Sequence, residues 1–172
     1  MRIKSRQLGR SVSTVFLVSW CAVNGVISEA SDQQASTLDM KMVERGRYLA
    51  KITGCNDCHT PGYLLSEGKT SEQLWLTGDS FGWRGPWGTT YAKNLRLFVS
   101  SLTEDQWVST AKSLKTRPPM PWFNLNDMEE NDLRALYQFV RYLGPNGVPA
   151  PAYVPPDREP SPPYALFPSP PQ

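Results

Sequence analysis

Apolar side chains recur at helical spacing in three stretches of the chain, which predicts three main helices. The first helix runs from about Met40 to Thr53 and ends at Gly54, because glycine readily adopts the conformation found just after a helix end. Gly46 stands in the middle of this helix, where glycine costs about 1 kcal/mol relative to alanine. A close helix crossing at Gly46 explains that cost, since no side chain stands in the way there.

The second predicted helix begins after Thr103. The segment Thr103-Glu104-Asp105-Gln106 matches a capping box, in which the threonine and the glutamine satisfy free backbone groups reciprocally. This helix should run to about Leu114. The third predicted helix is capped by Asn126 or Asp127 and stops at Gly144-Pro145. Its apolar stripe consists of Leu133, Leu136, Tyr137, Val140 and Leu143.

The segments between these helices carry loop signals. In residues 61–94, glycines are spread among the aromatic residues Trp75, Trp83, Trp87 and Tyr91. A loop of this length is uncommon in a compact domain unless it wraps a ligand, although aromatic residues also form ordinary cores. Residues 115–122 form a proline-rich, rigid stretch that is unsuited to a helix or a central strand.

The two ends of the chain differ from its middle. Four basic residues precede an apolar run over residues 12–27, and Ser28-Glu29-Ala30 follows, a pattern that predicts a secretory signal over residues 1–30 with cleavage after about Ala30. The run is shorter than the ~20 apolar residues of a spanning helix, and a retained anchor is the alternative. Residues 31–39 are then a flexible start, residues 40–144 the folded domain, and residues 145–172 an extended tail with 11 prolines in 28 residues.

The charge of the exported chain is close to zero. The whole chain has 18 Lys and Arg and 16 Asp and Glu; removing four basic residues and one acidic residue with residues 1–30 leaves 14 and 15, a formal charge of −1. This balance gives no electrostatic basis for nucleic-acid binding.

The tail interrupts its prolines with apolar residues, which favours contact with a surface, either of its own domain or of a partner, over a purely flexible linker.

Cys55-Asn56-Asp57-Cys58-His59 has the C-x-x-C-H pattern of covalent c-type haem attachment. Cys55 and Cys58 add to the two vinyl groups of the haem, and His59 is an axial ligand of its iron. A thioredoxin-like redox pair also uses C-x-x-C, but near a βαβ pattern that this sequence lacks. A structural zinc site usually needs four cysteine or histidine ligands, and residues 31–172 contain only these two cysteines and one histidine.

The second axial ligand has to be another residue type, because His59 is the only histidine of the chain. Methionine is the usual partner in cytochromes c, and residues 31–172 contain Met40, Met42, Met120 and Met128. Met120 is favoured, since the rigid stretch between Pro119 and Pro121 can hold its thioether at a fixed point. Met128, an open iron site and a gap-filling role for Met120 are the alternatives.

These motifs together resemble a single-haem class I cytochrome c, similar to the haem modules in cytochrome subunits of periplasmic alcohol, aldehyde and sugar-acid dehydrogenases. The resemblance covers about residues 40–155. The matching segments are Gly46-Arg47-Tyr48-Leu49-Ala50, Cys55 to Thr60, Gly88-x-x-Tyr91-Ala92-x-Asn94-Leu95, Met120-Pro121-Trp122, Asp132 to Tyr137 and Leu143-Gly144-Pro145. It implies an all-α class I cytochrome c fold, with about three main helices and long loops around one covalent haem c, and with the first and last helices crossing at Gly46. Two departures are Arg96, which replaces a threonine, and a shortened loop over residues 97–101.

The sequence therefore predicts a periplasmic electron-transfer cytochrome with one haem ligated by His59 and Met120. It would carry electrons between a dehydrogenase and a respiratory acceptor, such as a terminal oxidase or another cytochrome, and would transform no substrate. One alternative is the haem subunit of an obligate oxidoreductase complex, with membrane-complex association. A less favoured alternative is an open-site haem enzyme or gas sensor; the lack of a second histidine counts against peroxidase chemistry.

Overall fold

The structure of the protein is a computed structural model that describes residues 38–167. The predicted secretory signal, residues 1–30, lies outside the described residues, as do residues 31–37 of the predicted flexible start and the last five residues of the tail. In the described part of the chain, no helix is long and apolar enough to cross a membrane.

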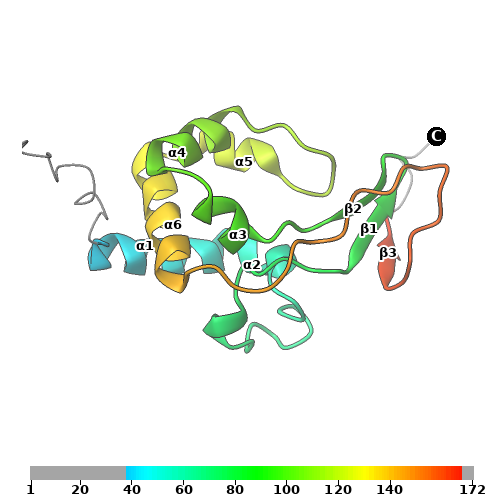
Figure 1. Ribbon diagram of the computed structural model, residues 1–172, viewed down its shortest axis with the longest axis horizontal. Coiled ribbons are helices and arrows are strands. Elements are labelled where there is room, and N and C mark those ends of the chain that lie inside the picture. Colours follow the sequence, from blue (N-terminus) through cyan, green and yellow to red (C-terminus); the bar gives the residue numbers. More distant parts are fainter. Residues whose placement is uncertain (1–37, 168–172) are drawn as a thin grey trace, which may run out of the picture. The chain divides into compact units, whose positions relative to one another are not determined.

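Residues 38–167 form helices together with a small sheet (Figure 1). The helices are α1 (Met40–Ile52), α2 (Cys55–His59), the 3-10 helix η1 (Glu72–Leu74), α3 (Leu95–Ser100), α4 (Glu104–Ser113), α5 (Trp122–Asp127) and α6 (Glu130–Leu143). The strands are β1 (Gly82–Gly85), β2 (Gly88–Tyr91) and β3 (Tyr164–Leu166), in the order β2-β1-β3. β1 pairs antiparallel with β2 and parallel with β3.

The predicted all-α, class I cytochrome c fold is therefore wrong. The described residues contain six α-helices and a three-stranded mixed sheet, so the architecture is mixed α/β. The reason lies in residues 82–91, where glycines that indicate a loop in the sequence stand at the ends of strands. Gly88 has φ of 94°, a conformation that favours glycine, and it closes the turn between β1 and β2. The third strand comes from the tail, 73 residues after Tyr91 in the chain.

Helices α1 and α6 make the most extensive contact between elements, and they cross at Gly46. A Cβ atom built on Gly46 would lie 2.0 Å from the carbonyl oxygen of Ala135 and 2.7 Å from Cβ of Phe139, both in α6. The close crossing expected from the sequence is confirmed, and only glycine permits it. Asp39 caps α1 by accepting from the backbone N–H of Lys41 at 2.8 Å.

The predicted capping box of the second helix is confirmed in α4. Thr103 Oγ1 accepts from the backbone N–H of Gln106 at 3.2 Å, and the Gln106 side chain accepts from the N–H of Thr103 at 2.9 Å.

The predicted start of the last helix is wrong, because α6 begins at Glu130. The Asn126 side chain instead lies in α5, an unpredicted helix, and donates to the carbonyl of Ala111 at 2.7 Å.

Arg96 in α3 is buried, with 6 % of its surface exposed, and its guanidinium donates to three backbone carbonyls. These belong to Gln73, at 2.8 Å, and to Leu143 and Gly144 at the end of α6. A cation at a helix C-terminus meets the negative end of the helix dipole and satisfies free carbonyls. Burial lowers the pKa of Arg96 from its usual value. This side chain joins η1, α3 and α6 on one side of the core.

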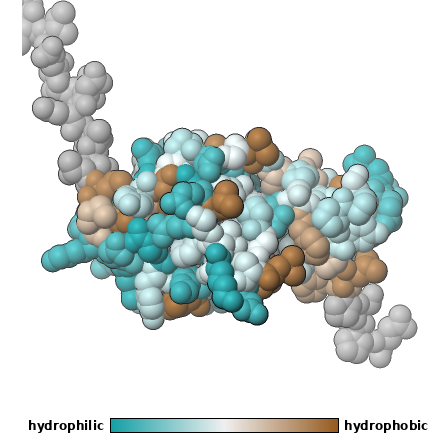
Figure 2. Space-filling view, turned by 90° about the horizontal axis from the view of Figure 1, so that it is seen from below, coloured by the Kyte–Doolittle hydropathy of each residue, from teal (hydrophilic) through white to brown (hydrophobic). Residues whose placement is uncertain are grey.

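The tail returns to the domain after α6. No helix forms over residues 144–167, and β3 is an edge strand that lies beside β1 (Figure 1). Exposed apolar side chains form separate patches among hydrophilic residues on the face drawn in Figure 2, and Leu65 is the most exposed of the large ones at 93 %. Scattered apolar residues of this kind are normal on protein surfaces.

Candidate functional site

The C-x-x-C-H segment forms the single turn of α2. Gly54 separates it from α1 and has φ of 76°, the left-handed conformation predicted for the residue after the helix end. Asn56 is fully buried in this turn, and its Oδ1 accepts from the hydroxyl of Thr60 at 2.7 Å. The Thr60 hydroxyl in turn accepts from the backbone N–H of Leu76 at 2.8 Å. These bonds hold the turn against the chain that follows it.

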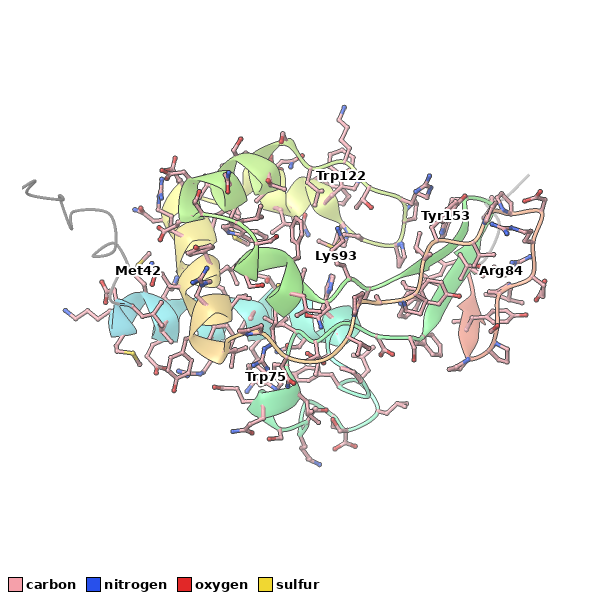
Figure 3. All side chains as sticks on the ribbon, viewed as in Figure 1. Met42, Trp75, Arg84, Lys93, Trp122 and Tyr153 are labelled. Atoms are coloured by element: carbon pink, nitrogen blue, oxygen red, sulfur yellow. The ribbon has the colours of Figure 1, made fainter. Side chains whose placement is uncertain are left out.

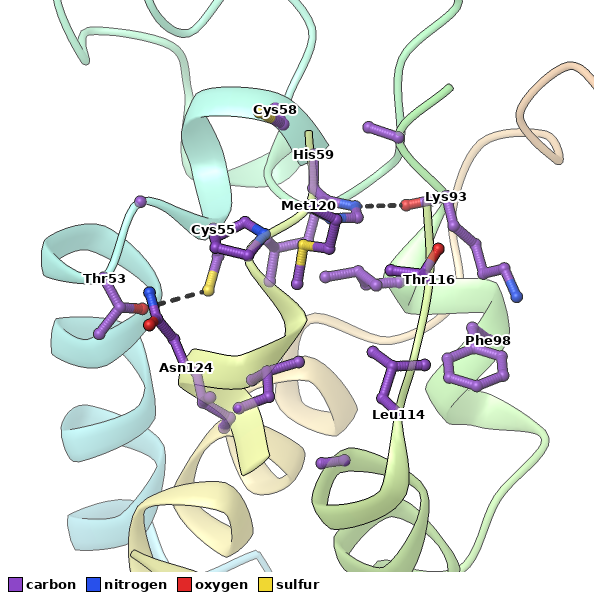
Figure 4. Close-up of a pocket in the computed structure, with 18 of the residues that line it drawn as sticks. Thr53, Cys55, Cys58, His59, Lys93, Phe98, Leu114, Thr116, Met120 and Asn124 are labelled. Carbon is purple, nitrogen blue, oxygen red and sulfur yellow. Dashed lines mark hydrogen bonds between the residues drawn. The ribbon is translucent and has the colours of Figure 1, made fainter. Parts of the chain in front are cut away.

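A cavity of about 290 Å³ lies beside α2 (Figure 4). This volume is just below the roughly 300–1,000 Å³ of small-molecule sites. Its walls come from the turn of α2, the hairpin β1–β2, the helices α3, α4, α5 and α6, and the loop that contains Met120. Apolar and aromatic side chains dominate the lining, among them Leu76, Trp83, Leu95, Phe98, Val99, Trp107, Leu114, Leu125, Leu136 and Val140.

Cys55 and Cys58 both line the cavity and are free thiols. The Thr53 hydroxyl lies 3.3 Å from Sγ of Cys55, a contact drawn in Figure 4. Burial raises the pKa of both thiols, which favours their neutral form. Redox-active C-x-x-C pairs need a thiolate and a lowered pKa, so these surroundings are unlike those of a thioredoxin-type pair.

His59 is 9 % exposed and also lines the cavity. Its Nδ1 lies 2.7 Å from the backbone carbonyl oxygen of Lys93 (Figure 4). A carbonyl only accepts, so Nδ1 carries the proton and Nε2 keeps its lone pair. Burial lowers the pKa of His59 more strongly than the Lys93 carbonyl raises it, which favours the neutral ring. Metal-bound histidines are oriented by such a bond from the other ring nitrogen.

Met120 and Met128 both line the cavity, whereas Met40 and Met42 lie in α1. Met128 also packs against the hydrophobic core, with partners in the buried cluster of the domain. Met120 stands in the segment between α4 and α5 and is drawn with His59 in the close-up of the cavity (Figure 4). The structure thus brings all four predicted site residues, Cys55, Cys58, His59 and Met120, to one cavity.

The residues of this cavity fit a haem by their chemistry. Two thiols stand on one turn, a neutral imidazole has a free lone pair, a thioether is available, and the walls are apolar. No group of three or more His, Cys, Asp and Glu side chains within residues 38–167 is arranged to hold a metal ion.

Several site residues were not predicted from the sequence. The Lys93 carbonyl orients His59, yet a backbone carbonyl has no residue-type signal, so no reading of the sequence could have found it. Thr53 and Arg117 also line the cavity. Their nearness in the chain to Cys55 and Met120 is the one signal that could have indicated them. Trp83 is one of the aromatic residues in the long segment over residues 61–94 that is expected either to wrap a ligand or to form core, and it does line the cavity.

In comparisons with protein-family models, with curated proteins and with solved structures, no match to this chain was found.

Proposed function

We propose that the protein is an exported c-type cytochrome that carries single electrons. Cys55 and Cys58 would hold one haem covalently, and His59 and Met120 would be its axial ligands. One observation carries the proposal: both thiols, the imidazole and the thioether line the same apolar cavity. The proposal rests on these residues and their surroundings, and not on membership of a fold family.

Each residue of the site has a separate task in this proposal. The two cysteines fix the group to the chain, and the Lys93 carbonyl holds Nε2 of His59 in the form that binds a metal. The apolar walls would limit the access of water to the bound group. A bound haem would supply an iron that accepts and releases one electron. If Met120 also held this iron, its thioether would favour the reduced state and raise the reduction potential.

The proposed partners are redox proteins. A periplasmic dehydrogenase would be the electron donor, and a terminal oxidase or another cytochrome would be the acceptor. Export to the periplasm is part of the proposal, because the signal pattern of residues 1–30 accompanies the haem motif. Electron-transfer complexes of this kind use small and transient interfaces, so no substrate pocket is required.

The decisive experiment is haem extraction from the purified protein after denaturation. Haem should stay on the chain in acidic organic solvent, since both thioether links are covalent. Cys55→Ala and Cys58→Ala should each weaken or abolish attachment, whereas Met128→Ala, which keeps both thiols, should leave the link itself unchanged. Haem that is extracted completely, or a purified chain that binds zinc in its place, would overturn the proposal.

A further inference from the structure

The C-terminal strap, which we define as residues 145–167, lies along the hairpin β1–β2. Thr89 and Val154 exchange two backbone hydrogen bonds, at 2.7 and 3.0 Å. Further along the strap, β3 pairs with β1 and the backbone N–H of Phe167 donates to the carbonyl of Arg84 at 2.7 Å. Tyr153 and Arg84 mark this region in Figure 3. The strap is therefore joined to the hairpin in its middle, at Val154, and at its C-terminal end, in β3 and Phe167.

Two aromatic residues of the strap contact residues that line the cavity. The guanidinium of Arg117 lies over the ring of Tyr153, 3.9 Å from its centroid. The ring of Phe167 packs edge-on against Trp83 with the ring centroids 5.7 Å apart. The Tyr153 hydroxyl also donates to the carbonyl of Trp87 at 2.8 Å, so its ring is fixed to the hairpin.

The methionine loop, residues 114–121, is anchored to α5 at its two ends: Asn126 donates to the carbonyl of Leu114 at 3.4 Å, and the backbone N–H of Trp122 donates to the carbonyl of Met120 at 2.9 Å. It joins α4 to α5 and forms neither helix nor strand. Its middle is held from outside by two contacts: Arg117 lies over Tyr153, and the Thr90 hydroxyl donates to the carbonyl of Pro118 at 2.7 Å. Both contacts fall within three residues of Met120, and both lead to the hairpin or the strap.

We propose that the strap and the hairpin position Met120, so that Tyr153 and Thr90 determine how firmly the thioether stays on the iron. This inference rests on the proposed function, in which Met120 is an axial ligand. A loop that is already ordered loses less conformational entropy when its methionine binds. Without the contacts to Tyr153 and Thr90, the Met120 thioether would leave the iron more often, and an external ligand would bind there more readily. Both are positioning residues, because neither would touch the iron.

The test uses the full-length, haem-loaded ferric protein and measures the rate at which cyanide binds. Tyr153→Leu should accelerate binding roughly two- to fivefold, the factor that corresponds to a cation–π contact at a partly exposed site. Thr90→Val should accelerate it roughly two- to tenfold, as for one hydrogen bond. Tyr153→Phe keeps the ring under Arg117 and should stay closer to the parent rate. The control Leu166→Ala changes a strap side chain that is 73 % exposed and should leave the rate unchanged.

The Met120→Ala background separates positioning from simple blocking of the cavity. In that background, Tyr153→Leu should no longer alter the cyanide rate, because no sulfur is left to position. An equal acceleration there would overturn the inference, as would parent-like rates for Tyr153→Leu and Thr90→Val in the presence of Met120. Arg117→Gln removes the same contact from the loop side without adding a thioether to the cavity, and it replaces Tyr153→Leu if that variant does not fold.

Failure of the proposed function has a different signature. If Met120→Ala itself binds cyanide at the parent rate, Met120 is not the ligand and the proposed function fails first. If Met120→Ala accelerates binding and the strap variants do not, the proposed function stands and only the positioning role is wrong.

Discussion

At the scale of single residues, the site depends on which atoms are left free. The Lys93 carbonyl occupies Nδ1 of His59, and burial keeps the ring neutral, so Nε2 is the nitrogen available to a metal. The same burial raises the pKa of Cys55 and Cys58. Thiols in such surroundings stay protonated near neutral pH, which suits residues that are joined once to a cofactor rather than cycled between thiol and disulfide.

The two methionines of the cavity are predicted to behave differently. Met120→Ala should abolish the far-red sulfur-to-iron absorption band of the ferric protein and lower its reduction potential, because the thioether ligand is lost. Met128→Ala should keep both properties and lower the free energy of unfolding by about 1–3 kcal/mol, because Met128 packs against the core. An absorption spectrum and a redox titration of each variant check this, and the reverse pattern would assign the ligand to Met128.

At the scale of elements, the crossing of α1 and α6 is set by one missing side chain. A Cβ atom at Gly46 would overlap the backbone of Ala135, which no rotamer change can relieve. The contact between α1 and α6 places α2, which follows α1 after two residues, beside the cavity. The geometry of the C-x-x-C-H segment is therefore linked to the packing of the two helices.

Gly46→Ala is predicted to lower the free energy of unfolding by about 3 kcal/mol, since the helices have to separate to admit the methyl group. The sign of this change in the free energy of unfolding is informative, because a glycine-to-alanine substitution at an open helix position raises the stability by about 1 kcal/mol. Urea unfolding of the haem-loaded protein measures the change. Lys51→Ala, at an exposed position of the same helix, should stay within about 0.5 kcal/mol of the parent. A neutral or stabilising Gly46→Ala would contradict the close crossing.

At the scale of the whole described molecule, the tail is part of the domain. Its strand β3 extends the hairpin, and Phe167 packs against both Trp83 and Trp87, with ring centroids 5.7 and 5.5 Å away. Arg84 connects the two segments further through Glu159, at 3.2 Å, although Glu159 is largely exposed and such pairs contribute little. The sheet therefore depends on residues at the far end of the chain.

Deletion of residues 157–172 is predicted to destabilise the isolated protein. It removes β3 and the two aromatic contacts of Phe167, which together correspond to about 2 kcal/mol. The thermal midpoint should fall by roughly 4–8 °C, as followed by circular dichroism. A shorter deletion of residues 168–172 keeps all of these contacts and should leave the midpoint unchanged. If the longer deletion also leaves it unchanged, the strap does not stabilise its own domain.

The sequence by itself determined the local features of this protein. Helix periodicity, the capping box at Thr103 and the need for a close approach at Gly46 all follow from residue type and short spacing, and the structure confirms them. The five-residue motif of Cys55 to His59 indicated a candidate site, and Cys55, Cys58 and His59 do line one cavity. These signals are readable because they depend on neighbours within one or two helical turns.

Only the tertiary structure decided the mixed architecture and the completion of the site. The all-α prediction is wrong because β3 pairs with a strand about 80 residues away, and such a pairing has no local sequence signal. The orientation of His59 depends on a backbone carbonyl, and the support of the methionine loop depends on Tyr153, which is 33 residues beyond Met120. Contacts of this kind arise from the path of the whole chain, since backbone groups and distant side chains meet only after the elements have packed.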